Sequence, residues 1–140
     1  MSPMPESGDR ELAQEALEAL SRAHAPYSRF PVGAALRARS GRTYRGVNIE
    51  NASLGLSICA ERVAVFTAVA AGEKEFDAIA IVTRASSPTP PCGACRQVLL
   101  EFAGDDLPVV LATTTQTAAT ERHTLGELVP VPFRRFEPGA

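Results

Sequence analysis

The apolar positions of the amino-terminal region predict one amphipathic packing helix. Its shared apolar face consists of Leu12, Ala13, Ala16, Leu17 and Leu20. Glutamates occupy the other faces, so we expect the apolar face to pack against the rest of the protein. Asp9 is the expected N-cap, and the helix is expected to run to about His24 because Pro26 cannot continue it.

Two further helices are predicted, and each begins at a cysteine. The first begins at Cys59 and ends near Gly72, and its predicted apolar face is Val63, Phe66 and Ala70. Gly72 is a suitable residue for the end of a helix because glycine adopts the left-handed conformation easily. The next helix is expected to stop at Gly104, and its apolar positions are Cys95, Val98, Leu99 and Phe102.

Strand patterns alternate with these helices. A turn signal at Ser40 and Gly41 separates two extended stretches that read as an antiparallel hairpin, residues 27–36 and 43–47. Two continuous apolar runs predict strands covered on both faces, residues 78–82 and 108–112. Alternating strands and helices predict one α/β layered domain that spans residues 1–140.

The carboxyl-terminal part of the chain carries weaker signals. Residues 113–123 are rich in Thr and Ala and predict one weak edge strand. Thr124 and Glu127 form a capping-box pattern, which predicts a short final helix ended by Pro130.

Composition and charge narrow the classes of partner. Of the 140 residues, 45% are hydrophobic and 21% are charged, which is typical of a globular domain. The formal net charge is −2, so a nucleic-acid partner bound through its phosphates is not expected. No apolar run approaches the roughly 20 residues of a membrane span, and the first residues do not resemble a signal peptide. Three cysteines, an odd number, suit a reducing compartment, and the cytoplasm is therefore expected.

The three cysteines lie in two short motifs that predict a catalytic zinc site. Cys59 is followed two residues later by Glu61, and Cys92 and Cys95 form a Pro-Cys-x-x-Cys run. Three thiolates fill three corners of a tetrahedral zinc site and leave the fourth open for water, as catalysis requires. Glu61 lies near enough to carry protons for that water. This spacing is the one found in zinc-dependent base deaminases.

The charge of such a site requires compensation. Zinc with three thiolates carries a net charge of minus one, which weakens it as a Lewis acid. Because both motifs are expected to open helices, the positive potential of two helix N-termini favours the thiolates and offsets this charge. Arg62, next to Glu61, is expected to contribute further positive charge.

Two other interpretations of the cysteines involve no catalysis at the metal. Cys92 and Cys95 alone could form a redox dithiol. They could also be half of a structural zinc site completed by His24 or His123. Neither interpretation uses Glu61, and neither histidine has a partner at ligand spacing, so the sequence favours the catalytic site.

A polar run, Asn48-Ile49-Glu50-Asn51, follows the second strand of the hairpin. It lies just before the zinc helix in the chain. The run could be a solvated loop, or it could hydrogen-bond a small polar ligand. The pattern alone does not distinguish the two.

Taken together, these motifs resemble the small cytidine deaminases of pyrimidine salvage. The resemblance covers residues 27–133, and its segments are residues 27–35, 46–52, 59–62, 91–97 and 125–130, with Phe133. It implies a three-layer α/β/α fold with a five-stranded mixed sheet. It also implies a homotetramer in which neighbouring subunits share sites.

The resemblance further implies roles for individual residues. Cys59, Cys92 and Cys95 would bind one zinc ion per chain, and Glu61 would carry protons. Asn48 and Glu50 would bind the ribose hydroxyls, the ring of Phe30 would pack on the pyrimidine, and the backbone near Ala60 and Cys92 would contact the base. Phe133 would close a neighbouring subunit's pocket. Leu54 stands where many relatives carry an aromatic residue.

The implied function is hydrolytic deamination of cytidine and 2′-deoxycytidine to the uridine compounds and ammonia. One alternative is a deaminase that acts on cytosine in nucleic acid, which the acidic charge and the carboxylate of Glu50 disfavour. Another is deamination of a related aminonucleoside. A non-enzymatic alternative is a structural zinc or redox module.

Overall fold

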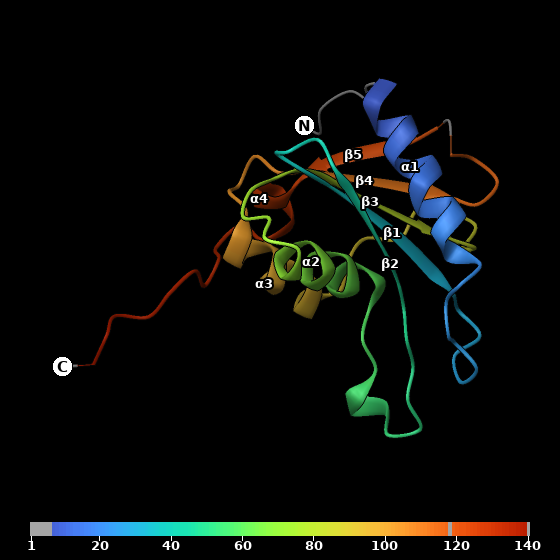
Figure 1. The fold of residues 1–140 in the computed structure, drawn as a ribbon, viewed down its shortest axis with the longest axis horizontal. Helices are drawn as coiled ribbons and strands as arrows, with labels where there is room; N and C mark the ends of the chain where they lie inside the picture. Colours follow the sequence, from blue (N-terminus) through green and yellow to red (C-terminus); the bar gives the residue numbers. More distant parts are fainter. Residues whose placement is uncertain (1–6, 118, 140) are drawn as a thin grey trace.

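Five strands form one mixed sheet with helices on both of its faces (Figure 1). The computed structural model describes residues 7–117 and 119–139. The strand order is β2-β1-β3-β4-β5, and all neighbours are antiparallel except β3 and β4, which are parallel. The elements are α1 (Ser7–Leu20), β1 (Val32–Ala38), β2 (Thr43–Val47), the 3₁₀ turn η1 (Leu54–Leu56), α2 (Ala60–Ala70), β3 (Phe76–Thr83), α3 (Gly93–Phe102), β4 (Pro108–Thr113), β5 (Glu121–Thr124) and α4 (Leu125–Leu128).

Helix α1 alone covers one face of the sheet (Figure 1). Its predicted apolar face is confirmed, because Leu12, Ala13, Ala16 and Leu20 are buried in one cluster with small residues of β1, β3 and β4. Two details of the prediction were wrong. The helix ends at Leu20 rather than near His24, and Asp9 lies inside its first turn rather than before it. There the Asp9 carboxylate is buried and lies 3.6 Å from Nε of Arg122, so it forms an ion pair with β5.

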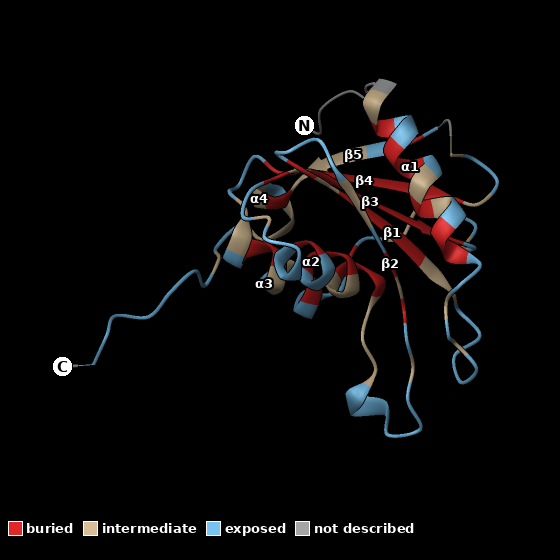
Figure 2. Cartoon of the chain, viewed as in Figure 1, coloured by how far each residue is buried: buried red, intermediate tan, exposed pale blue. Residues whose placement is uncertain are grey.

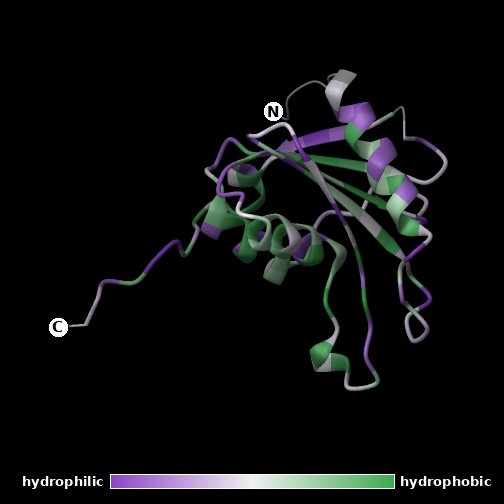
Figure 3. Cartoon of the chain, viewed as in Figure 1, coloured by the Kyte–Doolittle hydropathy of each residue, from purple (hydrophilic) through white to green (hydrophobic). Residues whose placement is uncertain are grey.

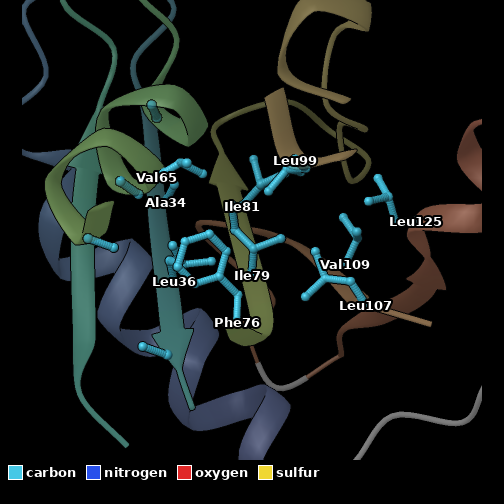
Figure 4. Close-up of a cluster of buried hydrophobic side chains, with 14 of the residues drawn as sticks. Ala34, Leu36, Val65, Phe76, Ile79, Ile81, Leu99, Leu107, Val109 and Leu125 are labelled. Carbon is cyan, nitrogen blue, oxygen red and sulfur yellow. The ribbon is translucent and has the colours of Figure 1, made fainter. Parts of the chain in front are cut away.

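Helices α2, α3 and α4 lie on the other face, over the larger of the two cores (Figure 4). Side chains of β1, β3 and β4 meet those of α2 and α3 there, among them Leu36, Ile81, Val65 and Leu99. The predicted apolar face of α2 was wrong. The helix buries Ala64, Val65 and Ala68, whereas Phe66 is 48% exposed.

Two glycines explain how closely the helices approach the sheet. A Cβ atom on Gly46 of β2 would lie 2.2 Å from the carbonyl oxygen of Ala60, in the first turn of α2. A Cβ atom on Gly33 of β1 would lie 2.0 Å from the carbonyl oxygen of Ala16 in α1. Helix backbone therefore rests directly on strand backbone at both positions, which only glycine permits.

The remaining predicted elements are present, with some shifted bounds. Strand β1 begins at Val32 rather than at Tyr27, where the chain forms a turn, and α3 ends at Phe102, shortly before Gly104. The hairpin pairs Ala34 with Gly46, and β3 and β4 are buried along almost their whole length. The weak edge strand is β5. The capping box is present, because Thr124 accepts from the backbone of Glu127 and Glu127 accepts from the backbone of Thr124. Gly72 follows α2 with a positive φ of 97°.

Two parts of the chain project from this body. One is the connection from β2 to α2, in which residues 51–56, including η1, are exposed, and the other is the end of the chain beyond Arg134, where residues 135–139 are exposed (Figure 2). Apolar residues occur in both, in contrast to the polar outer side of α1 (Figure 3). Leu54 and Leu56 of η1 are 69% and 65% exposed. Within the described residues, no helix combines the length and the apolar character needed to cross a bilayer.

Candidate active site

The first turns of α2 and α3 carry the three cysteines. Cys59 is the N-cap of α2 and Cys92 is the N-cap of α3, both with extended backbone and neither with a side-chain capping bond. Cys95 follows one turn into α3 and is buried. All three are free thiols. Two helix N-termini therefore bring their positive ends and their thiols to one place, as the sequence predicted.

The sulfur atoms are spaced for one tetrahedral ion. The Sγ atoms of Cys59 and Cys92 are 3.7 Å apart, those of Cys92 and Cys95 are 3.4 Å apart, and all three lie within 4.8 Å of one another. Zinc–sulfur bonds of about 2.3 Å in a tetrahedron place two sulfurs about 3.8 Å apart. The donor set therefore fits zinc. In the described part of the chain, this group contains no histidine, so His24 and His123 do not complete a four-ligand structural site.

The thiol pKa values of Cys59 and Cys95 are shifted in opposite directions. Hydrogen bonding from Cys95, together with that from Arg62, lowers the pKa of the Cys59 thiol to about 5. The Arg62 guanidinium donates to Cys59 Sγ at 3.4 Å, which confirms that Arg62 lies beside the cluster. The hydrogen bond with Cys59 and burial raise the pKa of Cys95. The cluster thus holds negative charge with one adjacent cation, which is a setting for a metal ion.

Glu61 is a buried carboxyl group beside this cluster. Its exposed fraction is 5%, and Oε1 has no hydrogen-bond partner among the described residues. Burial raises its pKa, as expected for a carboxyl group removed from water. A buried polar atom without a partner is costly and calls for a functional explanation. Here it is an oxygen available to a substrate or a water molecule.

A cavity of about 270 Å³ joins Glu61 to the polar residues after β2. It brings together residues from four separate segments of the chain, which are Ser28, Phe30, Val32, Asn48, Glu50, Cys59, Glu61, Ile81, Thr83, Thr89 and Cys92. Six of these were predicted as site residues. The polar run after β2 is therefore part of a pocket rather than only a solvated loop.

Asn48 and Glu50 are held in place by the segment that carries Phe30. The Asn48 amide accepts from Val32 N and donates to Phe30 O, both at 2.9 Å. The Glu50 carboxylate accepts hydrogen bonds from the backbone of Tyr27 and Ser28, and from the Ser28 hydroxyl. These bonds, with Ser28 the main donor, lower the pKa of Glu50 and keep it ionised.

Several lining residues were not predicted from the sequence. Ser28 lines the cavity and donates hydrogen bonds to Glu50. The next residue, Arg29, is not among the lining residues but adopts a φ of 57°, an uncommon conformation for a residue with a side chain. Thr83 and Thr89 pair through their hydroxyls at 3.0 Å. The position of Thr83 at the carboxyl end of a buried strand, where α/β proteins commonly bind ligands, is the signal that could have found it.

Four of the predicted site residues do not line this cavity. Two of them, Cys95 and Arg62, belong to the cysteine cluster. The other two are Ala60 and Phe133. Ala60 is buried beneath Gly46 in the first turn of α2. Phe133 follows α4, its side chain is 63% exposed, and it does not line the cavity of its own chain. Its predicted role was in a neighbouring subunit's pocket, and the single chain leaves that role untested.

Comparison with known proteins gives one consistent result. The family model of the cytidine and deoxycytidylate deaminase zinc-binding region matches residues 6–111. A cytidine deaminase from Sporosarcina psychrophila is 44% identical over 124 residues, 89% of this chain and 90% of the relative. One from Halalkalibacterium halodurans is 47% identical over 122 residues, 87% of this chain and 91% of the relative. The crystal structure of cytidine deaminase from Burkholderia pseudomallei superposes with a TM-score of 0.83 at 45% identity, and the match covers 88% of this chain and 97% of that one.

Proposed function

The chain belongs to the cytidine deaminase family, and from this premise we propose that it hydrolyses cytidine and 2′-deoxycytidine to uridine and 2′-deoxyuridine with release of ammonia. The observation that carries the proposal is the buried Oε1 of Glu61, which has no hydrogen-bond partner among the described residues, in a residue that lines the same cavity as Cys59 and Cys92. Such an oxygen suits a group that must accept a proton and then release it.

Cys59, Cys92 and Cys95 would hold one zinc ion, which acts as a Lewis acid that activates water when bound. Glu61 would accept a proton from the attacking water and donate it to N3 of the pyrimidine. The water oxygen forms a bond with C4, and Glu61 then transfers the second proton of the water to the amino nitrogen. The C4–N4 bond breaks, ammonia leaves and the C4 carbonyl of uridine remains.

The other lining residues would bind and orient the nucleoside. Glu50 is ionised and accepts hydrogen bonds, so it suits the ribose hydroxyls, which are donors. Asn48 donates one amide hydrogen to the Phe30 carbonyl, and the second has no acceptor among the described residues, so it suits a ligand. Phe30 lines the same cavity as Glu50 and Cys59, so its ring is available to stack on the base.

A substrate comparison tests this assignment. We expect kcat/KM for CMP to be at least ~10-fold below that for cytidine, because a phosphate near the ionised Glu50 meets like charge. The measurement is ammonia release from cytidine, 2′-deoxycytidine, CMP and adenosine. Glu50→Gln should narrow the gap between cytidine and CMP. Equal kcat/KM for CMP and cytidine would contradict the nucleoside assignment, and release from none of the four would contradict the activity.

Arg62 has a separate expected effect. Because the Arg62 hydrogen bond helps to lower the pKa of Cys59, Arg62→Ala should raise that pKa. A thiol of higher pKa is protonated at a higher pH, so zinc should be lost earlier on acidification. The measurement is zinc retained after dialysis at stepped pH, together with the acid limb of the pH–rate profile. Arg62→Lys keeps the charge, so its zinc loss should occur at a pH between those of the wild type and Arg62→Ala. Identical zinc-retention curves for the wild type and Arg62→Ala would contradict a role of Arg62 at the cysteine cluster.

We propose in addition that the working enzyme is a homotetramer with shared sites in the cytoplasm. A groove along α2 is lined mainly by apolar side chains from the projecting connection and from the helix, among them Ile49, Leu56 and Phe66. Ile49, Leu54, Leu56 and Phe66 are each more than 45% exposed in the single chain. Exposed apolar surface of this kind suits a second copy of the chain. Three free thiols suit a reducing compartment.

Mixing two damaged chains tests the sharing of sites. Chains with Glu61→Gln and chains with Phe133→Ala should each have reduced activity. In hybrid tetramers, a pocket with intact Glu61 can receive Phe133 from the other chain, so the mixture should exceed the summed activities of its components. A control mixture of Phe133→Ala with the double variant, which has no intact Phe133, should show no gain. A fully active monomer in analytical ultracentrifugation would contradict the proposal.

A further inference from the structure

The segment after α4 has no regular secondary structure, yet it is fastened to α3 at two consecutive residues. The carbonyl oxygen of Phe133 accepts a hydrogen bond from Nε2 of Gln97 at 2.8 Å. The next residue, Arg134, donates through Nη1 to the carbonyl oxygens of Leu100 at 3.2 Å and Ala103 at 3.1 Å. Its Nη2 pairs with the carboxylate of Asp105.

These bonds are directed to the carboxyl end of α3. Leu100 and Ala103 lie in the last turn and at the C-cap, where helical carbonyls lack partners within the helix. The negative end of the helix and the Asp105 carboxylate both favour a cation there. The planar guanidinium of arginine reaches all three acceptors at once, which a lysine ammonium on a flexible stem does not reproduce.

The start of the segment is also fixed. Arg96 donates to the carbonyl oxygens of Pro91 at 2.8 Å and Leu128 at 2.6 Å, so it joins the residue before Cys92 to the last residue of α4. Arg96, Gln97 and Arg134 thus tie the segment to the cysteine helix at three points. Phe133, whose carbonyl group is one of these anchors, is 63% exposed and is not among the residues that line its own chain's cavity.

We infer that Arg134 and Gln97 are positioning residues that hold Phe133 in a fixed outward place, where it can cover the pocket of a neighbouring subunit. The inference rests on the proposed role of Phe133 in shared sites. An aromatic residue on a free tail would have to be ordered each time a pocket closes, whereas the α3 anchors have already ordered it. The anchors would therefore act on substrate binding through Phe133 and leave the cysteine cluster unchanged.

A double-mutant cycle tests this. The cycle consists of Phe133→Ala, Arg134→Ala and the double variant, and KM and kcat for cytidine are measured together with zinc content and sedimentation. Arg134→Ala should raise KM roughly tenfold, the scale of a lost charged hydrogen bond. Zinc content and the assembly state should not change. The double variant should be no worse than Phe133→Ala alone, because an anchor without an aromatic residue to place has no further effect.

Three further variants separate placement from charge and from general stability. Arg134→Lys should remain impaired because a single ammonium does not reach all three acceptors. Gln97→Glu, which keeps the size but presents an acceptor to the Phe133 carbonyl, should also raise KM. Arg135→Ala removes the same charge from the neighbouring residue, for which no hydrogen bond appears in the described structure, and should behave as wild type.

The outcomes distinguish failure of the positioning inference from failure of the shared-site proposal. If Phe133→Ala is harmful but Arg134→Ala is silent, or if their effects multiply in the double variant, the positioning inference is overturned while the shared site stands. If Arg135→Ala matches Arg134→Ala, loss of charge explains the effect and the inference is again overturned. If Phe133→Ala itself is silent, both the covering role of Phe133 and the inference fail.

Discussion

Glu61→Gln is expected to lower kcat for cytidine by more than ~10⁴-fold while zinc content stays at one ion per chain. A single general acid–base group contributes about 10²–10⁴-fold, and Glu61 is proposed to serve more than one proton transfer. Glutamine keeps the size and the hydrogen bonding of the side chain but does not carry a proton at neutral pH. The measurement is single-turnover ammonia release beside metal analysis and a thermal melt.

The stability of this variant provides an internal check. Burial raises the pKa of Glu61, so ionised Glu61 destabilises the folded state near neutral pH. Glu61→Gln removes that charge, so its melting temperature should equal or exceed that of the wild type. The matched control is Glu11→Gln, at an exposed position of α1. A variant that retains a tenth of wild-type turnover would show that another group moves the protons. A large fall in melting temperature would mean that Glu61 also supports the fold.

Cys95→Ala is expected to abolish zinc binding and reduce activity to background. Cys95 is fully buried and is one of three thiols within 4.8 Å of one another, so its loss leaves only two ligands. A bound ion also links the first turns of α2 and α3, and its loss should lower the free energy of unfolding by about 3–4 kcal/mol, as for a ligand present at 100–1,000 times its dissociation constant.

Treatment with a chelator distinguishes the effect of losing the zinc ion from the effect of losing the Cys95 side chain. A strong chelator should lower the melting temperature of the wild type toward that of Cys95→Ala and should have no effect on the variant. If Cys95→Ala keeps stoichiometric zinc, the assignment of three thiolate ligands is wrong. If it loses zinc but remains active, the metal has no part in the chemistry.

The chemistry of this protein was more predictable from its sequence than the packing of its helices. The spacing of Cys59, Glu61, Cys92 and Cys95 has a chemical reason that does not depend on the rest of the fold. The structure brings all four together at two helix N-termini. Alternation of apolar runs likewise predicted β3 and β4, because strands covered on both faces need no knowledge of what covers them.

The buried face of α2 could not be predicted from the periodicity of its apolar residues. Periodicity finds an apolar stripe but not the partner that covers it. Helix α2 has two such stripes, and the sheet takes the smaller one, Ala64 and Ala68, because helix and strand lie too close for larger side chains. The larger stripe, with Phe66, stays exposed in the single chain.

Other misses have the same origin. Asp9 resembles a cap, but its partner Arg122 lies more than a hundred positions away in the chain. The Thr83 and Thr89 hydroxyls meet only after the strand end and the following loop have folded. Contacts that depend on distant residues leave no local pattern. Phe133 remains a prediction, since its role depends on a second chain.

The glycine beneath α2 also bears on how the hairpin chooses its alignment. Strand β2 is an edge strand that pairs with β1 across the turn at Ser40 and Gly41. A slip of one residue would turn Arg45 or Val47 toward the Ala60 carbonyl, and a slip of two would bring Tyr44 or Asn48 there. Each of these residues would place a Cβ atom about where a Cβ on Gly46 would lie, 2.2 Å from the carbonyl oxygen of Ala60. Gly46 therefore selects the register of β2 against β1. In this register Asn48 and Glu50 follow the end of β2 and line the pocket.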